Sequence, residues 1–304
     1  MNTVQKRSRR KLDNTLTAYL FLSPWLIGFI LFSGLPILAS FFISLTDWNL
    51  IQAPKLIGLK NYITMLSAGS GFLNSLKVTL LYTGFSVVVT VVWALFTALL
   101  LNMKTKLNGV FQFFYFIPAV IPTVSLAFAF QIIFNQHTGI LNYLLAFIGI
   151  KSQPNWLFDI QRVLPSVVFV SIYTYAAGQM MLIFKAGLAD VPSELYEAAE
   201  IDGAGFFQKF LHITLPSISP VLLFNTVTAC IGSLNNSFSL IFPLTNGGPN
   251  DATNVLSLSI YNNAFGNYRM GYASALSVVL FLIAAALALL QFYFSKKWVY
   301  YETE

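Results

Sequence analysis

Apolar residues gather in long runs along this chain, and short polar or Gly/Pro-containing segments separate the runs. Six runs are long enough to be considered as membrane spans, at residues 16–45, 78–101, 111–134, 163–187, 216–242 and 271–294. A helix needs about 20 mostly apolar residues to cross the hydrocarbon core of a bilayer. The pattern therefore predicts an all-α membrane protein that folds as a bundle of six transmembrane helices.

The segments around these runs complete the predicted organisation. A basic tail covers residues 1–15, one transmembrane domain covers 16–294, and a second tail covers 295–304. Within the transmembrane domain, a polar loop at 189–215 separates the fourth run from the fifth. The other connecting segments are too short to form an independent domain, so we expect a single membrane domain.

Basic residues predict the orientation of the bundle. Placing the N-terminus inside puts eleven of the seventeen Lys and Arg residues on inner segments, and five of these lie in the first eleven positions. Cytoplasmic flanks of membrane spans are normally enriched in such cations. An even number of spans returns the C-terminus to the same side, where Lys296 and Lys297 follow the last run. Both termini are therefore predicted to be cytoplasmic.

Composition excludes several classes of protein. The chain is 57% hydrophobic and 9% charged, whereas an ordinary soluble domain is about 25% charged. The net charge of +6 does not indicate nucleic-acid binding, because the cations flank apolar runs instead of forming one surface. The single cysteine, Cys230, excludes an internal disulfide, and neither His137 nor His212 has a neighbour at metal-ligand spacing.

Prolines lie within the first and third apolar runs and at the start of the fifth. A proline removes a backbone donor and can kink a helix, which is tolerated where neighbouring helices or water in a cavity satisfy the freed carbonyl. A bundle that lines a pathway therefore fits the pattern better than a simple anchor. The prolines are Pro24, Pro36, Pro118, Pro122, Pro216 and Pro220.

The runs contain almost no ionisable residue, and all eleven acidic residues fall in tails or loops. A proton- or sodium-coupled carrier usually needs a buried carboxylate or histidine in its path. The sequence also lacks a phosphate-binding P-loop and the G-x-S-x-G and H-E-x-x-H motifs of hydrolases. We therefore expect no catalytic residue, metal or cofactor on this chain, and any energy for pumping has to come from another chain.

The loop at 189–215 holds five of the eleven acids. Asp190 or Ser193 can cap a helix, Pro192 suits its first turn, and Gly203 can end it, which predicts a short helix of about three turns. On this helix a small apolar stripe is flanked by carboxylates, and it can either enter a groove on a soluble partner or form a solvated connector. The stripe contains Leu195, Ala198, Ala199 and Asp202.

The same loop resembles a motif of a known family. The spacing of its residues is similar to the EAA loop of bacterial ATP-binding-cassette (ABC) importer permeases, which have the type I importer fold. The matching residues are Glu197-Ala198-Ala199, Asp202-Gly203-Ala204, Ile213 and Leu215-Pro216. Four further segments resemble the carbohydrate branch, specifically the larger maltose and glycerol-phosphate permeases, and these segments are Phe21–Pro24, Ser44–Trp48, Gly58–Tyr62 and Thr245–Pro249.

The resemblance implies a function and a set of partners. It implies a carbohydrate permease subunit in the bacterial cytoplasmic membrane that forms half of a translocation path, usually as a heterodimer with a homologous permease. Two ATPase subunits, which use ATP and Mg, and an extracytoplasmic solute-binding protein would complete the importer. The implied contact with the ATPase consists of Leu195, Glu197, Ala198, Ala199, Asp202 and Gly203. The chain lacks the large external insertion and the additional spans of the maltose subunit.

Neutral polar residues in the fourth and fifth runs are candidates for the solute path. Sugars bind through neutral hydrogen bonds and aromatic faces, but small and amide residues also stabilise helix packing in membranes. The candidates are Tyr175, Gln179, Asn225, Ser233, Asn235 and Asn236. Gln179, Ser233 and Asn236 are favoured because they align with sugar-contacting positions in the maltose relative. The alternative function is an ATP-independent membrane channel or membrane enzyme whose loop resembles the motif by chance.

Overall fold

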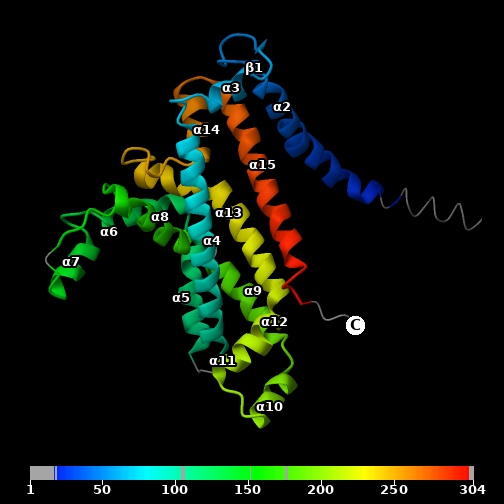
Figure 1. The fold of residues 1–304 in the computed structure, drawn as a ribbon, viewed down its shortest axis with the longest axis vertical. Coiled ribbons are helices and arrows are strands. Elements are labelled where there is room, and N and C mark those ends of the chain that lie inside the picture. Colours follow the sequence, from blue (N-terminus) through cyan, green and yellow to red (C-terminus); the bar gives the residue numbers. More distant parts are fainter. Residues whose placement is uncertain (1–16, 18, 104–106, 151, 175–176, 301–304) are drawn as a thin grey trace, which may run out of the picture.

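A computed structural model describes residues 17, 19–103, 107–150, 152–174 and 177–300. Most of the described chain is helical, and the long helices α4, α13 and α15 lie side by side along the long axis of the molecule (Figure 1). Two very short strands, β1 and β2, pair antiparallel with Thr46 opposite Leu56. The predicted all-α class is thus confirmed apart from this small hairpin.

Four helices are long and apolar enough to cross a membrane by themselves. They are Tyr19–Ser44, α4 (Phe72–Asn102), α13 (Ser219–Thr245) and α15 (Met270–Ser295). The first of these contains the π-helical turn η1 (Ile30–Gly34) and ends with α2 (Leu35–Ser44). Two bent helix pairs raise the number of candidate spans to six if each pair is counted as one span.

The runs at 111–134 and 163–187, each expected to be one span, form bent helix pairs in the structure. Helix α5 (Asn108–Val120) meets α6 (Thr123–Ile133) at 101°. Pro122 explains this break, because Ile121 before it is extended with ψ 132° and a proline disfavours helix at the preceding residue. Helices α8 (Ile160–Thr174) and α9 (Ala177–Ala189) form the second pair, bent by 57°.

The shorter elements gather at the two ends of the molecule. Figure 1 places β1, α3 and α14 at one end and α10 at the opposite end. The first end contains β1 (Thr46–Asp47), β2 (Lys55–Leu56), α3 (Lys60–Leu66), α14 (Leu256–Tyr261) and η3 (Asn262–Gly266). The loop at the opposite end contains α10 (Ser193–Ile201), α11 (Phe206–Lys209), η2 (Phe210–Thr214) and α12 (Leu215–Ser217), and the short helix α7 (Ile140–Phe147) projects beside α6 and α8.

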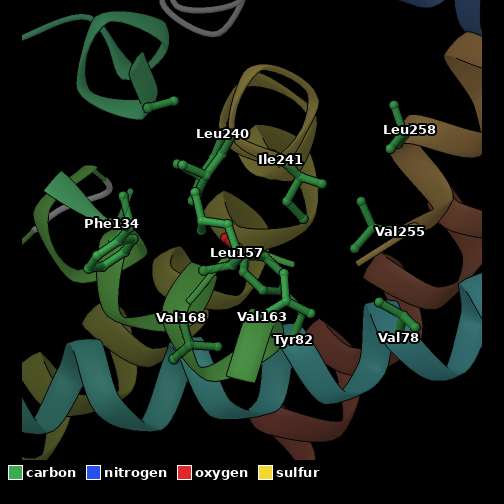
Figure 2. Close-up of a cluster of buried hydrophobic side chains, with 14 residues drawn as sticks. Val78, Tyr82, Phe134, Leu157, Val163, Val168, Leu240, Ile241, Val255 and Leu258 are labelled. Carbon is green, nitrogen blue, oxygen red and sulfur yellow. The ribbon is translucent and has the colours of Figure 1, made fainter. Parts of the chain in front are cut away.

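The main core lies between α4, α8 and α13. Figure 2 shows Tyr82 of α4, Val163 of α8 and Ile241 of α13 pointing toward one another, and all three are fully buried. A second core packs α9 against the small residues Ala94 and Ala98 of α4, which allow the two backbones to approach closely. Helices α4, α9 and α13 of these cores also carry the cavity residues described below.

The first helix contacts the rest of the chain near its C-terminal end. Phe41 contacts Phe281 of α15 edge-on, with ring centroids 6.1 Å apart. Asn61 Nδ2 donates hydrogen bonds to the carbonyls of Ser44 at 2.8 Å and Thr46 at 2.9 Å. The Gly271 N–H at the start of α15 donates to the Trp48 carbonyl at 3.3 Å. These bonds join the end of α2, the strand β1, α3 and α15.

Gly271 is required for this junction, because a Cβ atom there would lie 1.9 Å from the Thr46 carbonyl oxygen. We predict that Gly271→Ala lowers the thermal unfolding midpoint of the purified protein, since overpacking costs about 1–3 kcal/mol. Gly84→Ala is the matched control: nothing lies within 4 Å of a Cβ at Gly84 in α4, and alanine favours helix. Equal unfolding midpoints for the two variants would contradict the close approach.

Candidate functional site

Helix α10 lies at one end of the molecule (Figure 1), and along the chain it comes after α9 and before α13. The helix begins at Ser193 after Pro192, whose φ of −58° suits the entry to a helix. The prediction that Asp190 or Ser193 caps it is wrong, because no side chain makes a capping hydrogen bond and Ser193 is already the first helical residue. Glu194 lies in the first turn, where its charge complements the positive end of the helix.

Gly203 ends α10, as the sequence predicts. Its φ is +75°, in the left-handed region that favours glycine. The Gly203 N–H donates to the Glu200 carbonyl at 3.0 Å, and the Ala204 N–H donates to the Ala199 carbonyl at 2.8 Å. These two bonds form a Schellman motif, which satisfies carbonyls at the helix end and reverses the chain.

The predicted stripe on α10 is available for contact in this chain. Leu195, Glu197, Ala198 and Asp202 are exposed, whereas Ala199 is partly buried. The sequence analysis missed a neighbouring group of strongly exposed apolar residues around the Gly203 turn. They are Ile201 at 87%, Phe206 at 69% and Phe207 at 75% of full exposure. Their signal was present in the sequence, since large apolar residues in a polar loop outside the apolar runs indicate a surface for another protein.

Side-chain contacts hold α10 against the segment that follows it. Lys209 Nζ lies 2.7 Å from Glu200 Oε1, and this hydrogen bond and positive charge lower the pKa of the exposed Glu200 carboxyl. The hydroxyls of Tyr196 and Thr214 are 2.9 Å apart. A hollow of about 300 Å³ lies between α10 and the segment that contains α11 and η2. Its lining includes Ala199, Asp202, Lys209 and His212.

A second site is a cavity of about 300 Å³ between α4, α9 and α13. It brings together Gln179 of α9 with Ser233 and Asn236 of α13, the three favoured path candidates. Sequence analysis missed Ser86 and Thr90 on α4 and Thr228 on α13, which also line it. Ser86 and Thr90 are four positions apart and therefore share a face of α4, but only packing in three dimensions directs that face toward α9 and α13.

The other path candidates lie elsewhere or outside the described residues. Asn225 is fully buried, and its Nδ2 donates to the Met180 carbonyl at 3.4 Å, so it joins α13 to α9 instead of lining the cavity. Asn235 is exposed and does not line the cavity, because it lies about 100° around the helix from Asn236. Tyr175 falls outside the described residues.

The cavity offers neutral hydrogen bonds. Its described lining consists of hydroxyls, side-chain amides, small residues and apolar side chains such as Phe224, with no charged group among them. The ammonium of Lys185 on α9 instead donates to Gln112 Oε1 of α5 at 2.7 Å. Among the residues that the structure describes, no three His, Cys, Asp or Glu side chains come together as a metal site. This arrangement suits the binding of a neutral polar solute better than acid–base chemistry.

The whole chain is similar to known transport proteins. Residues 90–300 match the model of the family described as binding-protein-dependent transport system inner membrane component. The chain is 36% identical to the probable ABC transporter permease protein YesP of Bacillus subtilis, over 98% of this chain and 96% of that protein. It is 34% identical to the trehalose/maltose transport system permease protein MalF of Thermococcus litoralis, over 90% of this chain and 94% of that protein.

Two further comparisons agree. The chain is 31% identical to the arabinooligosaccharides transport system permease protein AraP of Bacillus subtilis, over 90% of this chain and 86% of that protein. The fold matches a chain of a bacterial ABC transporter involved in the import of the acidic polysaccharide alginate, with a TM-score of 0.81, 23% identity, and coverage of 96% of this chain and 99% of that one. The chain thus belongs to the family of binding-protein-dependent transport system inner membrane components.

Proposed function

We propose that this chain is a permease subunit of an ABC importer that carries a carbohydrate, such as an oligosaccharide or a sugar-like solute, across a bacterial cytoplasmic membrane. The observation that carries the proposal is the near full-length match to permeases named for trehalose/maltose and arabinooligosaccharide transport. The neutral, hydroxyl-rich and amide-rich cavity between α4, α9 and α13 supports the same class of solute. An ATP-independent channel or membrane enzyme is less well supported, because the match extends far beyond the loop.

The chain crosses the membrane six times in this proposal, with each bent pair counted as one span and both termini in the cytoplasm. The distribution of cations supports this orientation, because most lie on the segments assigned to the inside. Helix α10 is then cytoplasmic, and β1, α3 and α14 at the opposite end of Figure 1 face outward. A broken helix is tolerated at membrane depth where protein or cavity water satisfies its backbone.

An ATPase subunit binds the exposed face of α10 in this proposal. Glu197 and Ala198 are exposed there, and the small alanine side chain allows a partner backbone to approach closely. ATP and Mg belong to the ATPase, so the role of this chain is to transmit movement and to line the path. It is a transport subunit and not an enzyme.

A second, homologous permease encloses the other side of the path, and a solute-binding protein delivers the solute from outside. The family description itself names binding-protein-dependent transport. The alginate transporter has also been solved in complex with an alginate pentasaccharide-bound periplasmic protein, and its fold matches this chain with a TM-score of 0.80. We propose a heterodimer, as is usual among the permeases that the loop resembles.

Glu197→Lys tests the contact with the ATPase. The charge reversal is expected to abolish most ATP-driven uptake in reconstituted vesicles and to reduce the amount of ATPase that co-purifies with the permease. Asp47→Lys is the matched control, because this exposed carboxylate lies at the opposite end of the molecule. Co-purification of the ATPase with Glu197→Lys at the level seen with Asp47→Lys would contradict the assignment.

Asn236→Leu tests the cavity as part of the solute path. Losing one hydrogen bond worth about 0.5–1.5 kcal/mol is expected to raise the KM for uptake by roughly 2- to 12-fold while leaving ATPase association intact. Asn235→Leu removes the same amide from a neighbouring position that does not line the cavity. Equal KM values for the two variants would argue against a path through this cavity.

A further inference from the structure

The loop between α9 and α13 forms a closed elbow. One arm is α10, and the other arm is the segment made of α11 and η2, residues 206–214. The Schellman turn at Gly203 joins the arms at their vertex, the Glu200–Lys209 ion pair joins them farther along, and the Tyr196–Thr214 hydrogen bond joins them at the open end. With three ties at different distances from the vertex, the arms cannot open without breaking a bond.

The Tyr196–Thr214 bond is the strongest side-chain tie of the elbow. The Glu200 carboxylate is 67% exposed, and exposed ion pairs contribute little because water and salt screen them. Thr214 is only 5% exposed and Tyr196 is partly buried, so water competes less for their hydrogen bond. Thr214 Oγ1 also lies 3.4 Å from the Lys209 carbonyl, which can accept its proton.

Thr214 lies in the chain shortly before α13 begins. It is the last residue of the π-helical turn η2, in which the Leu215 N–H reaches back five residues to the Phe210 carbonyl. Pro216 follows and has no N–H to donate, and α13 begins at Ser219. Such π-turns are frequent at functional sites. A displacement of Thr214 is therefore passed to α13, the helix that carries Ser233 and Asn236 into the cavity.

The connection of α10 to α9 has fewer side-chain hydrogen bonds than its connection toward α13. Residues 190–192 lead from α9 into α10, and both Asp190 and Pro192 are exposed. Over the described residues, no hydrogen bond links a side chain of α10 to α9. The elbow is thus tied by side-chain hydrogen bonds toward the segment that leads into α13, whereas among the described residues it is joined to α9 by the chain at 190–192, in which Val191 packs against the second core.

We propose that the Tyr196–Thr214 hydrogen bond passes the movement of α10 to α13 and so links ATP hydrolysis to the solute cavity. This inference rests on the proposed function, in which an ATPase drives α10. Tyr196 is a positioning residue here, because it touches neither the nucleotide nor the solute. Its removal should leave a complex that still hydrolyses ATP but moves less solute for each ATP consumed.

The test uses the complete importer, with the second permease, the ATPases and the binding protein, reconstituted in vesicles. Solute transported per ATP hydrolysed is measured for Tyr196→Phe, Thr214→Val and the double variant. One lost hydrogen bond predicts a fall of roughly 2- to 12-fold for each single variant. The double variant should fall no further than Thr214→Val alone, because Thr214→Val already removes the bond that Tyr196→Phe removes.

Two matched variants separate transmission from general damage. Thr214→Ser keeps the hydroxyl and should retain the ratio of the unaltered complex, whereas Thr214→Val should not. Tyr143→Phe removes a hydroxyl from a side chain that is 73% exposed on α7, away from the elbow, and should have no effect. If Tyr196→Phe fails to assemble with the ATPase, the comparison of Thr214→Ser with Thr214→Val decides the question.

Three results would overturn the inference: an unchanged ratio for Tyr196→Phe, equal ratios for Thr214→Ser and Thr214→Val, or single effects that multiply in the double variant. Failure of the proposed function looks different. In that case the unaltered chain would not bind an ATPase or would not transport solute at the expense of ATP, whatever residue stands at position 196.

Discussion

Every backbone N–H and C=O in the apolar interior of a bilayer needs a partner within the protein, and this constraint shapes the whole chain. It explains why most of the described structure is helical. Where helices end or break, amide side chains take over the bonding. Gln131 Nε2 donates to the Pro243 and Leu244 carbonyls at the end of α13, at 2.7 and 3.1 Å, and Asn61 serves the end of α2 in the same way. Backbone that is not helical is therefore still hydrogen-bonded beside the helices that form the cavity.

The same constraint separates neutral polar groups from charged groups in this molecule. Charged groups are costly in the apolar region, so the cavity between α4, α9 and α13 relies on neutral groups, while carboxylates concentrate in the loop that contains α10. That loop folds by local rules, with Pro192 before the helix and Gly203 after it. The elbow then connects a charged, exposed surface to the neutral cavity through α13.

The sequence predicted features that depend on local chemistry and missed those that depend on packing. Run lengths located the helices, and the residue type at Gly203 predicted the end of α10. Pro122 indicated a possible kink, but the size of the bend was not predicted, because length and hydropathy do not distinguish a straight span from a broken one. Ser86 and Thr90 were missed because their role depends on which face of α4 meets α9 and α13. The Tyr196–Thr214 bond was missed because it joins residues 18 positions apart after a chain reversal.

We propose that α10 lies at the cytoplasmic surface and is held by an ATPase. Site-specific cross-linking from Ala198→Cys tests it directly, with Cys230, the single natural cysteine, replaced by serine. If an ATPase holds α10, a covalent adduct forms between position 198 and the ATPase in the assembled importer, and its yield changes when ATP is added. Absence of that adduct, together with labelling of position 198 by a membrane-impermeant thiol reagent added outside intact cells, would show that α10 is neither cytoplasmic nor held by an ATPase.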